Sequence, residues 1–166
     1  MAYHSLREFV DRLENENELV RIKDHVSPIL EITEVTDRVS KEPGGGKALL
    51  FENVEGSNIP VLINAFGSSK RINMALNVLD IEKIPNDIDK YLKIKPPSSF
   101  LEKVKLLPML LEAAAFPPKM VSSRQAACQE VVLIGDDVDL GEIPILQCWP
   151  NDAGRFITFP IVVNRT

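Results

Sequence analysis

The chain has 166 residues, enough for one domain of ordinary size or one domain and part of another, and 45% of them are apolar, so a core can form. Acidic residues outnumber basic ones by 24 to 19, and the net charge of -5 argues against nucleic acid or an anionic membrane surface as a partner. No window approaches the roughly 18 apolar residues of a membrane span, and no signal peptide opens the sequence, so we expect a cytoplasmic protein without a transmembrane segment.

Helix and strand patterns alternate in the first part of the sequence. Ser5 and Glu8 form a capping box before apolar residues at helical spacing, which predicts a first helix. Ser27 and Pro28 suit the N-cap and the first position of a second helix, with Ile32 on its buried face. In chain order we predict a helix at residues 5–15, a strand at 18–26, a helix at 28–41, and two strands buried on both faces at 47–54 and 59–67. This order predicts a mixed α/β layer.

Helical spacing dominates after Gly67, until prolines and a polar stretch interrupt it at residues 116–124. We place a domain boundary there, which gives an N-terminal α/β domain at 1–115 and a second, β-rich domain starting at 116–166. Pro108 is expected to kink or break the last helix. The predicted elements are helices at 68–79, 85–95 and 98–116, a strand at 128–135, a polar turn at 136–144 and a strand at 155–166.

Two charged or glycine-rich features resemble ligand sites, and for both we favour a structural interpretation. Three glycines precede Lys47, but the spacing of a phosphate-binding loop is missing and a strand follows, so a plain turn is expected. The acidic cluster of Asp136, Asp137, Asp139 and Glu142 lacks the pattern of a calcium loop, and we interpret it as a solvated turn.

The histidines and cysteines offer no metal site either. Asp24 and His25 are adjacent on a predicted strand and point to opposite faces, so we expect two surface residues and not an acid/base pair. Cys128 and Cys148 belong to no CxxC motif, and we expect two buried thiols in a reducing compartment.

The most distinctive stretch is ILQCWPNDAGRFITFP, residues 145–160. A buried tryptophan after a proline turn, leading into an alternating strand, would account for it by pattern alone. However, CWPNDAGRFIT, together with GGGKALLFENVEGSNIPVLINAFGS and LREFVDRLENENELVRI, resembles the N-terminal part of the UbiD family of decarboxylases. The resemblance covers nearly the whole chain, and it implies that residues 116–166 are the truncated start of a β-barrel-like flavin-binding domain.

The resemblance implies a carboxy-lyase that uses prenylated flavin mononucleotide with manganese or magnesium, and often potassium. Its substrate would be an aromatic or α,β-unsaturated acid, 3-polyprenyl-4-hydroxybenzoate of quinone biosynthesis being the best-known example. The complete enzyme would be a homo-oligomer. In such chemistry the cofactor is the electron sink, while the protein positions the cofactor, metal and substrate.

By the same resemblance, Thr158 falls where the family places a side chain near the flavin. A threonine chosen only for its strand propensity is the competing interpretation. The family's metal ligands and catalytic arginine and glutamates belong downstream of residue 166, so we expect no catalytic or metal-binding residue in this chain. This segment alone is then expected to bind no cofactor and to be inactive.

Two hypotheses remain open from the sequence. The first is the N-terminal part of a flavin-dependent decarboxylase, and the second is a noncatalytic α/β module that binds a partner. The unpaired apolar strand that ITFPIVV would expose favours the first, because a free-standing module would be expected to cover it.

Overall fold

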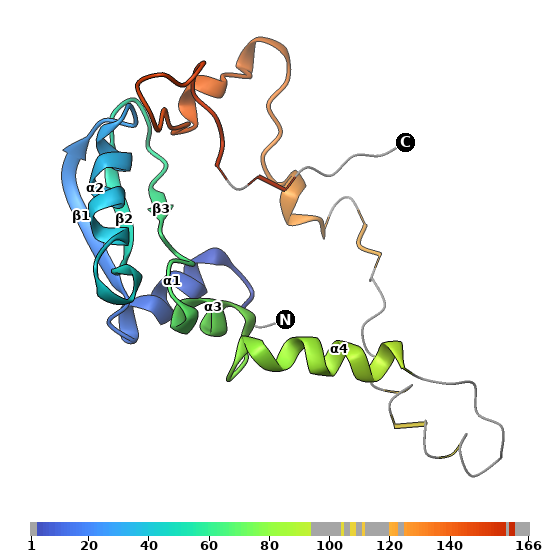
Figure 1. The fold of residues 1–166 in the computed structure, drawn as a ribbon. Helices are drawn as coiled ribbons and strands as arrows, with labels where there is room; N and C mark the ends of the chain where they lie inside the picture. The colour runs from blue at the N-terminus through green and yellow to red at the C-terminus, as the bar shows by residue number, and fades with distance from the viewer. Residues whose placement is uncertain are drawn as a thin grey trace. The chain divides into compact units, whose positions relative to one another are not determined.

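The computed structural model describes residues 3–93, 104, 107–108, 111, 120–122, 125–158 and 160–161 (Figure 1). The chain divides into two compact units, one made of Met1–Ile81 with Asp139–Thr166 and the other of Glu82–Val138. The predicted helix at 98–116 lies almost wholly outside the described residues. In the part of the chain that is described, no helix is long and apolar enough to cross a membrane.

The fold is a mixed α+β fold, as the sequence predicts (Figure 1). Its longer elements are α1 (Leu6–Asn15), β1 (Leu19–Val26), α2 (Glu31–Ser40), β2 (Ala48–Val54), β3 (Val61–Ile63), α3 (Ser69–Leu76) and α4 (Ile84–Leu92). Short 3-10 helices are η1 (Pro43–Gly45), η2 (Ile81–Lys83), η4 (Ala127–Gln129), η5 (Gly135–Asp137) and η6 (Leu140–Glu142).

The sheet has the strand order β1-β2-β3. β1 and β2 are parallel, with Leu19 opposite Ala48, and α2 forms the crossover between them. β3 is antiparallel to β2, with Leu62 opposite Leu50. The strands predicted at 18–26 and 47–54 are confirmed, whereas the segment predicted at 59–67 forms a strand of only three residues.

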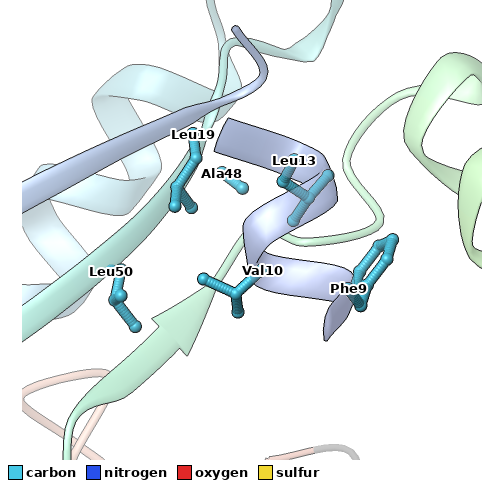
Figure 2. Close-up of a cluster of buried hydrophobic side chains, with 6 residues drawn as sticks. All are labelled: Phe9, Val10, Leu13, Leu19, Ala48 and Leu50. Atoms are coloured by element: carbon cyan, nitrogen blue, oxygen red, sulfur yellow. The ribbon is translucent and has the colours of Figure 1, made fainter. Parts of the chain in front are cut away.

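Side chains of β2 point alternately to the two faces of the sheet, and a helix covers each face. On one face, Ala48 and Leu50 meet Phe9, Val10 and Leu13 of α1 (Figure 2). The start of α1 is as predicted, since the Ser5 hydroxyl accepts a hydrogen bond of 3.3 Å from the amide of Glu8.

On the other face, β2 packs against α2. Leu49 and Phe51 contact Ile32 of α2, and Val35 and Val39 of the same helix pack around them. Leu146, far away in sequence, is buried in this second cluster, and Cys148 packs against it. The prediction of a strand buried on both faces is therefore confirmed for β2 but wrong for β3, whose three residues are only half-buried.

The predicted start of α2 is wrong by about one turn. The helix begins at Glu31, and the residue before it, Leu30, has a φ of 66°. The Ser27 hydroxyl accepts from the amide of Ile29 instead of capping the helix, and the carbonyl of buried Pro28 accepts from the amide of Gln147.

Two of the predictions for the second part of the chain are wrong. Residues 128–135 form no strand, because the described structure there contains η4 and an irregular stretch with exposed apolar side chains. Cys128 is exposed, not buried, and Cys148 is half-buried. Of the strand predicted at 155–166, the described residues show an isolated bridge between Phe156 and Leu146. The polar turn at 136–144 is confirmed as η5 and η6.

Candidate functional site

A cavity of about 840 Å³ lies in the first unit, on the side of the sheet that α1 covers. Its size falls in the range of small-molecule sites. Its apolar lining comes from α1, β2, β3 and the residues after β3, mainly Leu6, Phe9, Val10, Leu50, Leu62 and Phe66. Its polar lining consists of Arg7, Asp11, Arg21, Glu52, Asn64 and Thr158.

Arg21 of β1 is held in ion pairs at this cavity. Its Nη1 lies 2.6 Å from Oε1 of Glu52, and its Nη2 lies 2.8 Å from Oε2 of Glu14. The hydrogen bonds that Arg21 donates to Glu14 and Glu52 raise the pKa of Arg21, and the bond that Glu14 accepts lowers the pKa of Glu14. Because two carboxylates already neutralise this guanidinium, Arg21 is not available to bind an anionic ligand.

A buried polar network fixes the segment that carries Asn64, one of the residues lining the cavity. Asn64 adopts a left-handed conformation, with φ of 56°, and its amide donates to the carbonyls of Gly45 and Lys47 at 2.8 and 2.9 Å. Arg71 of α3 is 0% exposed and donates to the carbonyl of Gly46 at 2.5 Å. The three-glycine segment is thus a turn that receives side-chain donors, in agreement with the prediction against a phosphate loop.

Glu18 provides the counter-charge for this network. One carboxylate oxygen lies 3.0 Å from Nη1 of Arg71 and the other lies 2.9 Å from the Lys70 ammonium. Burial acts to raise the pKa of Glu18, but the hydrogen bonds from Lys70 and Arg71 outweigh it, so the pKa lies below its ordinary value. The network therefore ties the residue before β1, the glycine turn and α3 together.

The CWPND stretch forms a turn closed by Asp152. One carboxylate oxygen, Oδ2, accepts from the amides of Cys148 and Trp149 at 3.1 and 2.8 Å. After this turn, the amide of Phe156 donates to the carbonyl of Leu146 at 3.0 Å. These contacts bring Phe156 back beside Leu146, and Thr158 follows two residues after Phe156.

The structure places Thr158 on the cavity, and it does not bring the other chemically suggestive residues to it. Asp24 and His25 are exposed on β1, and the acidic residues of the 136–142 turn are exposed as well, as predicted. No group of three His, Cys, Asp or Glu side chains suited to a metal ion occurs among the described residues. The apolar part of the lining can accept a flat aromatic ring, and polar side chains, the Thr158 hydroxyl among them, line the same cavity, but the described residues do not fit a metal ion.

Sequence reasoning missed Arg71 and Asn64. A signal for Arg71 was present, because Met74 and Ala75 follow it at helical spacing and pack against the core, which puts an arginine on an apolar face. Asn64 had a weaker signal, since asparagine is one of the few residues that tolerate a positive φ.

Comparison with known proteins identifies two matching family models. Residues 10–90 match the 3-octaprenyl-4-hydroxybenzoate carboxy-lyase N-terminal domain, and residues 119–166 match the Rift-related domain of the same carboxy-lyase. An uncharacterized protein of Aquifex aeolicus is 52% identical over 163 residues, which cover 98% of this chain and 33% of that protein. The chain thus spans about a third of the length of the curated relatives it matches.

Solved structures of UbiD-class enzymes share the fold. An evolved dimeric form of HmfF from Pelotomaculum thermopropionicum, in complex with prFMN, matches with a TM-score of 0.60 and 28% identity over 92% of this chain and 30% of that one. Vanillic acid decarboxylase of Sedimentibacter hydroxybenzoicus, in its closed form, matches with a TM-score of 0.64 and 25% identity over 92% of this chain and 29% of that one. The chain therefore belongs to the UbiD family, and it corresponds to the family's N-terminal part.

Proposed function

We propose that this chain is the N-terminal part of a decarboxylase that uses prenylated FMN to remove the carboxyl group from aromatic or α,β-unsaturated acids. The observation that carries the proposal is the match over 92% of the chain to a UbiD-class enzyme in complex with prFMN. Among possible substrates we include 3-polyprenyl-4-hydroxybenzoate, because both matching family models bear the name of a carboxy-lyase for a compound of this type.

Within this function, Thr158 is the residue of this chain that we propose to contact the flavin. Its support is its place on a cavity that has a largely apolar lining from α1, β2 and β3, since a flat aromatic ring binds to apolar surface and a hydroxyl orients it. When bound, prenylated FMN supplies the electron sink for the pair released with carbon dioxide. The chain's own contribution is to shape and hold the wall of that site.

We further propose that the complete enzyme binds manganese or magnesium, and potassium, through residues outside this chain. The catalytic arginine and glutamates are assigned outside it as well. The complete enzyme is proposed to be a cytoplasmic homo-oligomer. The 166-residue chain alone is proposed to bind no cofactor and to have no turnover. We do not favour the alternative of a noncatalytic module, because the family to which the chain belongs is one of carboxy-lyases.

The first test compares the 166-residue chain with a protein of the relatives' full length. Each is incubated with prenylated FMN and manganese, and carbon dioxide release is measured from a panel of aromatic and acrylic acids. We expect turnover with the full-length protein and none with the shorter chain. Carbon dioxide release by the shorter chain would refute the assignment of the catalytic residues. A flavin-loaded full-length protein that is inactive on every acid would refute the proposed decarboxylase activity.

The role of Thr158 is tested in the full-length protein by Thr158→Val, which keeps the shape of the side chain and removes the hydroxyl. We expect flavin affinity, followed by its absorption spectrum, to fall by about three- to ten-fold, the range for one lost hydrogen bond. Thr158→Ser should restore it. Thr36→Val is the control, because the Thr36 hydroxyl bonds to the carbonyl of Ile32 within α2. Equal affinities for all three variants would leave Thr158 no role in binding.

A further inference from the structure

Leu30 occupies a strained backbone conformation directly before α2. Its φ and ψ are 66° and -37°, and the amide of Glu31 donates across it to the carbonyl of Ile29 at 2.8 Å. These are the features of the γ-turn with positive φ, which is rare and strained for residues other than glycine. A leucine kept in this conformation must be held there by its surroundings.

The contacts that hold Leu30 come from a segment more than a hundred residues later, Ile145–Trp149, which we name the strap. The amide of Leu30 donates to the carbonyl of Gln147 at 2.9 Å, and the amide of Gln147 donates to the carbonyl of Pro28 at 3.1 Å. Ile29 and Gln147 form a parallel β-bridge. Both partners belong to the first compact unit.

Side chains of the strap add burial to these backbone bonds. Leu146 is 6% exposed and belongs to the core cluster of α2 and β2, and Cys148 packs against the same cluster. The burial of Leu146 supplies a favourable free energy that offsets the cost of the γ-turn. The strap and the γ-turn therefore depend on each other.

We propose that the strap and the start of α2 form a coupled conformational device, in which docking of the strap forces Leu30 into the γ-turn and release of the strap lets Leu30 return to negative φ. The device extends toward the cavity, because the carbonyl of Leu146 accepts from the amide of Phe156, two residues before Thr158. The docked strap thus positions the Thr158 segment at the cavity wall. This inference does not rest on the identity of the ligand.

The half-buried thiol of Cys148 reports on release of the strap. Cys148 is on the strap and Cys128 is the chain's only other cysteine, so a Cys128→Ser background leaves one thiol to label. The rate of labelling by a thiol reagent in native buffer then measures how often the strap opens. Trp149, the only tryptophan, provides a fluorescence signal from the same segment.

The decisive comparison is Leu30→Gly with Leu30→Ala. Both variants lose the leucine side chain, but only alanine keeps a Cβ that is strained at positive φ. Glycine also gains backbone freedom when the strap opens, and this gain offsets part of the stability that the docked strap gains from the missing Cβ. We expect Cys148 to be labelled about three- to ten-fold more slowly in the glycine variant than in the alanine variant. Equal rates, or faster labelling of the glycine variant, would overturn the coupling.

A second pair of variants tests the backbone bonds from the strap side. Gln147→Pro removes the amide that donates to Pro28, whereas Gln147→Ala keeps it. We expect labelling of Cys148 at least about ten-fold faster for the proline variant and within about two-fold of the parent for the alanine variant. Similar rates for the two variants would overturn the proposal. If Leu30→Gly or Leu30→Ala does not fold, the Gln147 pair decides the proposal, and Leu30→Asn replaces the glycine variant because asparagine tolerates positive φ.

Discussion

The sheet of residues 3–81 and the segment of residues 125–138 are both rich in apolar side chains, yet they bury them very differently. Leu49, Leu50 and Phe51 of β2 are at most 7% exposed, because helices cover both faces of the strand. The run Val131–Ile134 is at least 52% exposed at every position. An apolar run becomes a buried strand only where other elements supply a ladder partner and a covering layer.

The largest expected effect concerns the polar network that closes the sheet region. Arg71→Met should destabilise the chain by about 3–5 kcal/mol, because it leaves Glu18 and the glycine carbonyls without their buried donor. Urea unfolding followed by circular dichroism measures the loss. The control is Lys70→Met, which removes the half-exposed second partner of Glu18 and should cost about 0–1 kcal/mol. Equal costs would show that burial of the guanidinium is unimportant.

The same residue type in the two regions gives the sharpest test of the contrast in burial. Ile32 is 0% exposed and Ile134 is 75% exposed. Ile32→Ala should cost about 2–5 kcal/mol in unfolding free energy, through lost burial and a cavity. Ile134→Ala should change it by no more than about 0.5 kcal/mol. A cost above about 2 kcal/mol at Ile134 would break the comparison, since it would mean that this side chain is buried in solution.

A pair of glycines separates crowding from backbone strain. Gly45 and Gly135 both have positive φ, but a Cβ at Gly45 would lie 1.9 Å from the carbonyl oxygen of Gly67, whereas a Cβ at Gly135 would meet nothing within 4 Å. Gly135→Ala should cost roughly 1–2 kcal/mol, the strain alone. We expect Gly45→Ala to lower the thermal unfolding midpoint clearly more than Gly135→Ala does, because the added Cβ also clashes with Gly67. Similar midpoints for both variants would show that the glycine turn can move away from Gly67.

The smallest expected effect is a dependence of stability on pH from Glu18. Because its folded pKa lies below the ordinary value of 4.5, the carboxylate stabilises the fold above about pH 4.5, and this contribution is lost as the pH falls through the folded value. In Glu18→Gln, the fall in unfolding free energy on acidification should be shallower than in the parent. A parallel fall in both proteins would exclude this carboxylate as a source of acid sensitivity.

Local patterns predicted the sheet region well and the later part poorly. The cap at Ser5, the strands β1 and β2, and the buried face of α2 all depend on residues close in sequence, and each was predicted from them. The γ-turn at Leu30 could not be predicted, because its cause is Gln147, far along the chain. The sequence wrongly predicts a strand for the exposed run at 131–134, because an apolar run shows which residues are apolar and not whether partners cover them.

The same distinction holds at the cavity. The importance of the CWPND stretch was clear from its composition, and Asp152 explains its spacing, since the carboxylate reaches amides three and four residues earlier. The position of Thr158 on the same cavity as Pro60 and Leu62 results from the tertiary fold and has no local signal. The resemblance to the family was visible in three stretches of sequence, and the family models that match residues 10–90 and 119–166 show the membership.

The mixed connectivity of the sheet has a consequence for the order in which it assembles. β2 and β3 are antiparallel neighbours joined only by residues 55–60, whereas β1 reaches its parallel partner across residues 27–47, which include α2. Closing the shorter loop costs less chain entropy. We therefore expect the hairpin of β2 and β3 to nucleate the domain, and β1 to dock afterwards with its crossover helix.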